Sequence, residues 1–323
     1  MPSDTHILQI CNVGQIAGGT AACAWSLTQA LPQCRHSVAF LSSVSDSTRQ
    51  VFQPHRVESW PHCTSDQIQR LAPELVILHN TSPAHSTLWD EVPTIQYIHS
   101  AGRRLSADLT VYCSEWLARA CKVDSASILW QGVPRPLNPS SFDRTLNPRL
   151  KVGRLCTPSN RKWPKDLPQF YSSLAQRHSE VDWEFVGCPL ALQPILQTAC
   201  QGRATFHSAS WDARSLFWSW DAMLYHHATL TESFGRTVAE AARTGCIPIV
   251  DDRGGFTEQL RSLNLRGCSS WSDFSAQLTA IQEPQLRRSI STSIQSLADE
   301  QFSIRAFGQR IQTLLQRLNS IRT

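Results

Sequence analysis

The sequence lacks the features that would assign it to several common classes of protein. None of its 11 cysteines falls in a CxxC pair, which excludes zinc ribbons and thioredoxin-like redox sites. No stretch approaches the roughly 18 apolar residues of a transmembrane helix. The N-terminal residues MPSDTHILQI also lack the basic and apolar regions of a signal peptide. We therefore expect a cytoplasmic protein with reduced thiols.

Charged residues are scarce, at 17% of the chain, and the net charge is only +4. This balance argues against a disordered chain and gives no basis for nucleic-acid binding. The charge is nevertheless uneven. Residues 1–147 hold 10 basic and 11 acidic side chains, whereas residues 148–323 hold 20 and 15. The basic second half favours an anionic ligand, although a chance surface bias would give the same count.

Short apolar runs alternate with helical segments through the first half. Because such runs are typical of strands buried on both faces, they indicate a parallel sheet in a doubly wound α/β fold. The strands expected here are residues 6–10, 75–78, 94–98, 109–112 and 128–130, with helices over 20–31 and from 115 onward.

The pattern stops at residues 134–148, which contain four prolines, and then restarts. We read this segment as a linker between two domains, residues 1–147 and 148–305. The strands expected after it are 150–153, 183–186, 204–207, 222–225 and 247–250, with helices over 167–177 and 234–244. Residues 306–323 form an amphipathic helix that we expect to pack back on the N-terminal domain; a helix lying on a membrane surface is the alternative.

Residues 231–260, TESFGRTVAEAARTGCIPIVDDRGGFTEQL, carry the densest set of candidate site residues. Glu232 and Glu240 are separated by seven residues, and the turn Ser233-Phe234-Gly235 follows the first of them. A carboxylate accepts hydrogen bonds from two hydroxyl groups at once. Glycine turns and helix starts present backbone N–H groups to phosphate. The stretch therefore predicts a site for a polyhydroxylated, phosphorylated ligand.

Basic residues follow the first strand of the second half. The chain has only four lysines, and Lys151, Lys162 and Lys165 fall within one short segment together with Arg154. Cations that follow a strand lie at the carboxyl edge of a parallel sheet, where they are placed to bind a diphosphate. A solvated basic loop is the alternative interpretation.

Two further features of the first half are candidates for a site. Gly18 and Gly19 lie between a strand and a helix and could cradle a phosphate, but the spacing matches neither the GxGxxG fingerprint nor a Walker loop. His99 ends an apolar strand, and His79 has a similar position. The pair at residues 226–227 has no third ligand at a metal spacing, so we expect no metal site.

The segment from Glu232 to Glu258 resembles the Glu-x7-Glu signature of the retaining, family 4 (group 1) glycosyltransferases. The motifs CSEWLA with WQGVP, VGRL with Lys162, and FVGCP resemble other motifs of that family, in the same order along the chain. The resemblance spans essentially the full length. It implies the GT-B fold, an α/β fold in which two Rossmann-like domains face each other across a cleft.

The resemblance also implies a role for each matching catalytic residue. Glu232 would lie beside the donor sugar and bind its hydroxyl groups. Arg154 and Lys162 would hold the donor diphosphate and stabilise charge on the departing nucleotide. His99 would lie near the reacting sugar from the opposite domain, unless His79 takes that place.

The same resemblance implies how the nucleotide is held. Glu240 would bind the ribose hydroxyls. Gly18, Gly19 and the turn Ser233-Phe234-Gly235 would contribute to binding through backbone N–H groups. The family generally works without a metal ion and needs no cofactor besides the nucleoside diphosphate sugar.

The chain departs from the family pattern in three places. Lys162 is farther from Arg154 than usual, so Lys165 or Arg161 could take its part. Gln131 replaces the asparagine that usually precedes the glycine of the WQGVP motif. The first half is short for the family, and it is this half that normally shapes the acceptor pocket.

We therefore expect a retaining hexosyltransferase that acts on a glycan, a lipid-linked or a small-molecule acceptor in glycoconjugate synthesis. A UDP-sugar is favoured over a GDP-sugar as the donor. We expect a cytoplasmic protein, with weak association at the inner face of the membrane left open. The alternatives are another GT-B activity, such as an epimerase or a phosphorylase, and an inactive sugar-nucleotide-binding protein.

Overall fold

A computed structural model describes residues 4–84, 91–102, 105–138 and 149–322. The chain divides into two compact units, one made of Met1–Val133 with Phe302–Thr323 and the other of Pro134–Gln301. The second unit thus begins before the expected boundary at residue 147, and the chain returns to the first unit at residue 302. Most of the expected linker, residues 139–148, lies outside the described residues.

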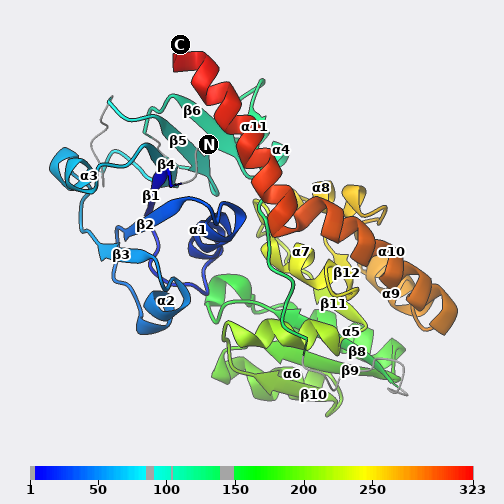
Figure 1. The fold of residues 1–323 in the computed structure, drawn as a ribbon. Helices are drawn as coiled ribbons and strands as arrows, with labels where there is room; N and C mark the ends of the chain where they lie inside the picture. Colours follow the sequence, from blue (N-terminus) through cyan, green and yellow to red (C-terminus); the bar gives the residue numbers. More distant parts are fainter. Residues whose placement is uncertain (1–3, 85–90, 103–104, 139–148, 323) are drawn as a thin grey trace. The chain divides into compact units, whose positions relative to one another are not determined.

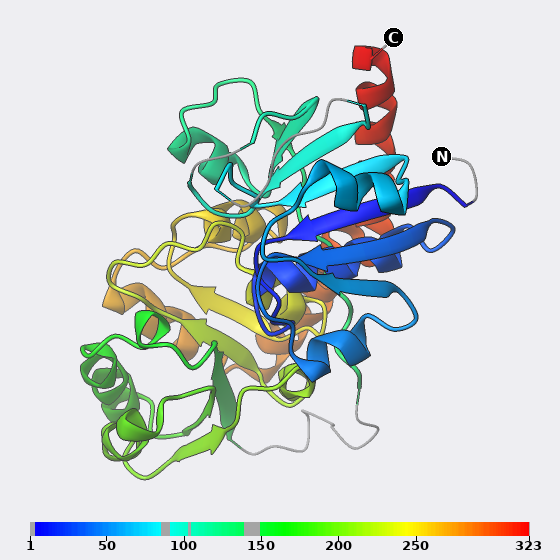
Figure 2. The same ribbon diagram turned by 90° about the vertical axis from the view of Figure 1, so that its left-hand side faces the viewer.

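In the described part of the first unit, one parallel sheet has the strand order β3-β2-β1-β4-β5-β6-β7. Figure 2 shows its strands running in a common direction. The order reverses at β1 and β4, which are neighbours in the centre of the sheet. The strands are β1 (His6–Cys11), β2 (Arg35–Phe40), β3 (Arg56–Ser59), β4 (Leu75–His79), β5 (Thr94–Ile98), β6 (Leu109–Tyr112) and β7 (Ser127–Ile128).

Two of these strands were not expected from the sequence. The segment RHSVAF of β2 begins with Arg35, His36 and Ser37, so its apolar run is too short to signal a strand. In the structure the side chains of His36 and Ser37 are nevertheless buried. β3 is a four-residue edge strand, and its residues are only partly buried or exposed.

Helices pack on this sheet, as Figure 1 shows. Ile68 and Leu71 of one of them, α3, join an apolar cluster with Leu8, Ile10 and Val76 of the strands. The helices of this unit are α1 (Gly19–Ala30), α2 (Asp46–Val51), α3 (Ser65–Leu71), α4 (Glu115–Ala120) and α11 (Ile304–Arg322).

The C-terminal helix α11 packs against α1 within the first unit (Figure 1). The two backbones approach closely, because a Cβ atom on Gly308 would lie 2.7 Å from the carbonyl oxygen of Ala30. Ile311, Leu315 and Leu318 of the expected apolar stripe are buried. Packing on the protein therefore accounts for the stripe. None of the helices in the described part of the chain is long and apolar enough to span a membrane.

The described part of the second unit repeats the same plan, with a parallel sheet of order β10-β9-β8-β11-β12. Its strands are β8 (Leu150–Leu155), β9 (Val181–Val186), β10 (Ala204–His207), β11 (Ala222–Tyr225) and β12 (Ile247–Val250). The α-helices are α5 (Leu167–Arg177), α6 (Gln193–Ala199), α7 (Arg236–Ala242), α8 (Gly255–Ser262), α9 (Trp271–Ala280) and α10 (Pro284–Phe302), and 3₁₀ turns occur at η2 (Asn160–Lys162), η3 (Leu190–Leu192) and η4 (Asp212–Trp218).

Gly153 allows the core of the second unit to close around β8. A Cβ atom at this position would lie 2.1 Å from the ring of Trp220, which is completely buried. The Trp220 ring is also fixed by a hydrogen bond of 2.9 Å from its Nε1 to a carboxylate oxygen of Glu184. The absence of a side chain at Gly153 is therefore what lets the indole ring pack against the strand that carries Arg154.

We predict that Gly153→Ala lowers the free energy of unfolding by about 1–3 kcal/mol or more, because an added methyl group must displace a large, tightly held ring. Denaturant unfolding of Gly153→Ala, Trp220→Leu and the double variant measures the effect. The double variant should be less destabilised than the sum of the two single changes. Additive losses would contradict the steric explanation.

Candidate functional site

The expected donor-site residues of the second unit follow strands β8 and β11, which are adjacent in the sheet. The strand order reverses between these two strands, since β9 and β10 lie on one side and β12 on the other. In open α/β sheets, ligands bind beyond the carboxyl ends of the strands at such a reversal. The sequence thus places its candidate residues at the position that the topology itself favours.

Arg154, near the end of β8, is completely buried. Its guanidinium group lies 4.4 Å from the ring centre of Tyr225 and 5.2 Å from that of Trp163. Its two terminal nitrogens donate to the carbonyl oxygens of His226, at 3.0 Å, and Lys162, at 2.9 Å. No carboxylate among the described residues forms an ion pair with it. Arg154 therefore places a positive charge, held by aromatic faces and carbonyl groups, next to the loop that carries Lys162.

Lys162 and Glu232 form the ion pair at the surface of this arrangement. Their side chains are 16% and 21% exposed, so both are partly accessible to a ligand. The Tyr225 hydroxyl donates to the same oxygen of Glu232, Oε1, at 2.9 Å. Burial raises the pKa of Tyr225, so its hydroxyl keeps the proton that it donates. Of the two candidate lysines, the structure thus brings Lys162 to Glu232, while Lys165 is exposed.

His227, for which the sequence predicted no such role, forms a hydrogen bond to the loop that carries Lys162. His227 Nε2 donates to the carbonyl oxygen of Arg161 at 2.9 Å, while its Nδ1 accepts from the backbone N–H groups of Thr229 and Leu230. Both ring nitrogens are thus used in hydrogen bonds. Together with Arg154, His227 fixes two consecutive carbonyl groups of the loop that ends at Lys162.

Two glycines, Gly254 and Gly255, contact the backbone of Glu232. Gly254 has a φ of +65°, and a Cβ atom there would lie 2.5 Å from the carbonyl oxygen of Glu232. The N–H of Gly255 donates to that same oxygen at 2.9 Å. Gly235, with a φ of +86°, begins α7. The predicted glycine turns therefore position the backbone of Glu232, and the side chain of Phe234 in the turn is buried.

Glu240 pairs with two arginines in the structure. It is completely buried in α7, and its carboxylate lies 3.1 Å from Arg214 Nε and 3.6 Å from Arg236 Nε. Arg214 comes from η4 and stacks on the Trp211 ring at 4.4 Å. Its partnership with Glu240 could not be read from the sequence.

The remaining candidates lie in the first unit. Gly18 precedes α1, and its carbonyl oxygen accepts the first bond of that helix from Ala22 at 3.0 Å. Gly19 is exposed at the helix start, which has no side-chain cap. This glycine loop follows β1, at the reversal of strand order between β1 and β4.

His79 and His99 are joined in a chain of hydrogen bonds. The Gln9 side-chain oxygen accepts from His79 Nε2 at 2.9 Å, which leaves His79 Nδ1 to accept from His99 Nε2 at 3.0 Å. His99 Nδ1 then accepts from the Gln131 amide at 2.9 Å. Both rings are satisfied as neutral imidazoles. His99 is 8% exposed and His79 is fully buried, so His99 is the one of the pair that can meet a ligand.

Burial lowers the pKa of His79 to about 3. The ring therefore stays neutral at physiological pH, as the hydrogen-bond chain requires. The thiol of Cys23 brings a third possible metal-ligand atom within 4.8 Å of the two imidazoles. Because each imidazole nitrogen already has a hydrogen-bond partner, the arrangement is explained without a metal ion.

No family model matches the chain, and no curated protein matches it in sequence. Solved structures, however, match it over almost its whole length. The Anabaena protein HepE, in complex with UDP and glucose, is similar with a TM-score of 0.75 and 17% identity, covering 97% of this chain and 100% of that one.

Two further solved structures show the same likeness. A glycosyltransferase from Rickettsia africae has a TM-score of 0.78 and 12% identity. Sucrose-phosphate synthase from Thermosynechococcus elongatus has a TM-score of 0.72 and 12% identity, and each alignment covers 98% of this chain and 99% of the other. At such low identities the likeness establishes the fold. The chain has the α/β GT-B fold, as the sequence resemblance implied.

We predict that the buried His79 makes the protein less stable in acid. The pKa of His79 is depressed in the folded state, so below about pH 6.5 this histidine is protonated in the unfolded chain but not in the folded one. The free energy of unfolding therefore falls as the pH drops from about 6.5 toward 3. Between pH 7.5 and 5.5, His79→Gln should lose about 1.4 kcal/mol less of its unfolding free energy than the wild type.

Denaturant unfolding at the two pH values measures this difference. His62→Gln, at an exposed histidine of the same unit, is the control and should show the wild-type loss. An unchanged pH dependence in His79→Gln would show that the ring is not held neutral by burial.

Proposed function

We propose that the protein is a retaining glycosyltransferase that transfers a hexose-type sugar from a nucleoside diphosphate sugar to an acceptor hydroxyl group. The observation that carries the proposal is the pairing of Lys162 with Glu232 where the strand order of the second sheet reverses. One group matches a diphosphate and the other matches sugar hydroxyls. The GT-B fold and the matching motifs agree with this assignment.

Lys162 is proposed to bind the donor diphosphate. When the bond between the anomeric carbon and the diphosphate oxygen breaks, the oxygen keeps the electron pair, and a nearby ammonium group stabilises that charge. In the structure Glu232 forms an ion pair with this ammonium group. When the donor binds, the ammonium group of Lys162 would leave Glu232 and bind the diphosphate.

Glu232, once released, accepts hydrogen bonds from the hydroxyl groups of the sugar. Tyr225 remains bonded to Oε1 and keeps the carboxylate oriented during the exchange. The acceptor oxygen then forms its bond to the anomeric carbon on the face that the diphosphate leaves, and its proton passes to the departing diphosphate. Such a front-face reaction retains the configuration of the sugar.

Arg154 is proposed to act chiefly through Lys162. Its guanidinium is fully buried and holds the Lys162 carbonyl, so it contributes positive charge and loop position from beneath the diphosphate. Glu240 is proposed to bind the ribose after Arg214 moves aside. His99, with the loop at Gly18 and Gly19, is proposed to serve the reaction from the first unit.

A UDP-sugar is the donor that we propose to test first, because HepE has been crystallised with UDP and with UDP-glucose. Thermal unfolding with a panel of nucleotide sugars identifies the donor, since a ligand of the folded state raises its stability. Product detection with that donor and an acceptor panel follows, with and without EDTA. Transfer that survives EDTA supports the proposal, whereas the absence of stabilisation by every nucleotide sugar would refute it.

We predict that Glu232→Gln lowers kcat by about 10²–10³-fold, because sugar hydroxyls lose a charged acceptor that orients the reacting carbon. Binding of the nucleoside diphosphate should stay within a few-fold of the wild type. Steady-state kinetics and calorimetric titration separate the two effects. Glu300→Gln, at an exposed glutamate of the same unit, should behave as the wild type. Equal losses of binding and rate would argue against a sugar-facing carboxylate.

We predict that Lys162→Ala weakens nucleoside diphosphate binding about tenfold or more and also lowers the rate, because a charge-assisted contact to the diphosphate is lost. Binding of the nucleoside alone should change little. Lys165→Ala, an exposed lysine three positions along the same loop, is the matched control. If Lys165→Ala carried the loss and Lys162→Ala did not, the two lysines would exchange roles.

A further inference from the structure

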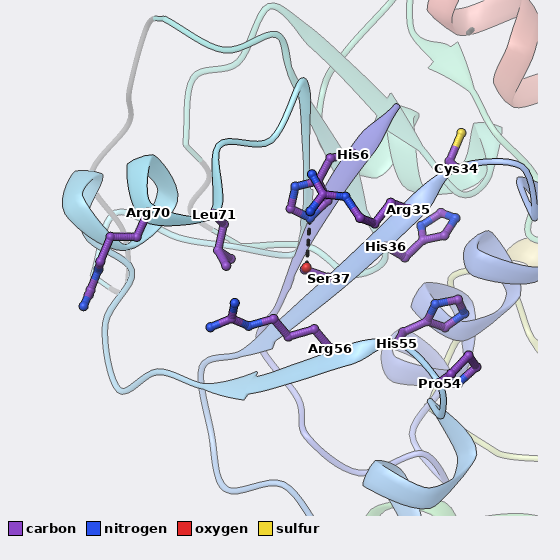
Figure 3. Close-up of a pocket in the computed structure, with 10 residues that line it drawn as sticks. All are labelled: His6, Cys34, Arg35, His36, Ser37, Pro54, His55, Arg56, Arg70 and Leu71. Atoms are coloured by element: carbon purple, nitrogen blue, oxygen red, sulfur yellow. Dashed lines mark hydrogen bonds between the residues drawn. The ribbon is translucent and has the colours of Figure 1, made fainter. Parts of the chain in front are cut away.

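A cavity of about 370 Å³ lies at the amino ends of β1, β2 and β3, beside α3. Figure 3 shows its lining side chains, which come from the first residues of these strands and from the last residues of the helix. A smaller cavity of about 130 Å³ shares Arg56, Arg70 and Leu71 with it and extends to Trp60. The glycine loop and His79 follow the opposite, carboxyl ends of the strands, so these cavities are separate from the candidate site.

The larger cavity is lined by three arginines and by no aspartate or glutamate. Arg35 begins β2, Arg56 begins β3, and Arg70 lies in the last turn of α3. Arg56 pairs with Glu58 at 2.7 Å, in the smaller cavity. In the described part of the chain, neither Arg35 nor Arg70 forms an ion pair with a carboxylate. Arg35 therefore offers the cavity a guanidinium group, whereas the side chain of Arg70 points away from His6 and Arg35 (Figure 3).

Two buried histidines of the cavity have a ring nitrogen without a hydrogen bond. His6 and His36 are 2% and 3% exposed, and the Nδ1 atom of each lacks a partner of bonding geometry. His36 Nε2 donates to the Leu31 carbonyl oxygen at 2.9 Å, and His6 Nε2 is bonded to the Ser37 hydroxyl at 2.8 Å. Both nitrogens are themselves buried, so a ligand in the cavity reaches them only if the surrounding groups move.

The imidazoles are neutral in this state. Burial lowers the pKa of His36 to about 4. It also lowers the pKa of His6, where Arg35 acts in the same direction and the carbonyl groups of Leu71 and Ala72 oppose it. The positive charge of the cavity thus belongs to the arginines.

We infer that this cavity is a second ligand site, which binds a small phosphomonoester of about the size of a sugar phosphate. The inference goes beyond the proposed transfer reaction and does not depend on it. The guanidinium groups of Arg35 and Arg56, from the starts of two neighbouring strands, match the oxygens of a phosphate. The volume also lies in the range of small-molecule sites.

The smaller cavity indicates what the rest of the ligand is. Glu58 and Gln67 line it and offer oxygens that accept hydrogen bonds from hydroxyl groups. The ring of Trp60 provides an apolar face of the kind that packs against a sugar ring. The phosphate would occupy the arginine-lined cavity, and the hydroxylated body of the ligand would extend toward Trp60.

Calorimetric titration of the full chain with glucose 6-phosphate, inorganic phosphate and glucose tests this site at constant ionic strength. The Lys162→Ala background weakens phosphate binding at the candidate donor site. In that background glucose 6-phosphate should bind more tightly than inorganic phosphate, and glucose should not bind. Arg35→Gln and Arg56→Gln should each weaken binding about tenfold, through loss of one charge-assisted contact.

Arg119→Gln, at an exposed arginine of α4 outside the cavity, is the matched control and should bind as its parent does. The Arg35→Gln variant with Lys162 intact should bind nucleoside diphosphate as the wild type does. Loss of binding at the cavity can therefore be distinguished from loss of binding at the candidate donor site. The inference is overturned if glucose 6-phosphate does not bind, if its affinity is unchanged in both arginine variants, or if only phosphatidic acid vesicles bind.

Discussion

The guanidinium group of Arg154 carries its charge at a completely buried position, and the donor site of the second unit is arranged around it. A charge buried without a carboxylate partner must be offset by other groups. Here the charge is offset by the ring faces of Tyr225 and Trp163 and by two backbone carbonyl groups. Those same contacts fix the backbone at Lys162 and the end of β11. The buried guanidinium of Arg154 thus fixes the loop that carries Lys162. The ammonium group of Lys162 in turn pairs with Glu232.

The two ends of the parallel strands serve different chemistry. In each unit the expected reactive or phosphate-binding groups follow the strands at which the order of the sheet reverses, because only there do the connections diverge and leave backbone and side chains accessible. The amino ends of β1, β2 and β3 instead gather arginines and buried histidines around the separate cavity of the first unit. The two proposed sites also differ in their charged groups: one has a lysine paired with a carboxylate, and the other has arginines at the starts of strands.

The sequence predicted those parts that depend on local pattern. Strands such as β4 and β5 are buried on both faces and therefore read as continuous apolar runs. The strand β2 was not predicted, because it begins with polar residues. His36 and Ser37 are buried there only because of their neighbours in the folded unit. The pairing of Lys162 with Glu232 joins two loops far apart in the chain, and the resemblance placed both residues at one ligand. The burial of Glu240 by Arg214 could not be predicted, because it depends on how η4 packs against α7.

The most direct measurement is a crystal structure of the protein with a non-hydrolysable UDP-sugar analogue. The account predicts that the diphosphate lies beyond the carboxyl ends of β8 and β11, with Lys162 bonded to a phosphate oxygen. Glu232 should be released from Lys162 and bonded to a sugar hydroxyl, while Tyr225 remains on its Oε1 atom. A nucleotide bound elsewhere, or one bound there while the Lys162–Glu232 pair stays intact, would contradict the exchange of partners on which the proposed mechanism rests.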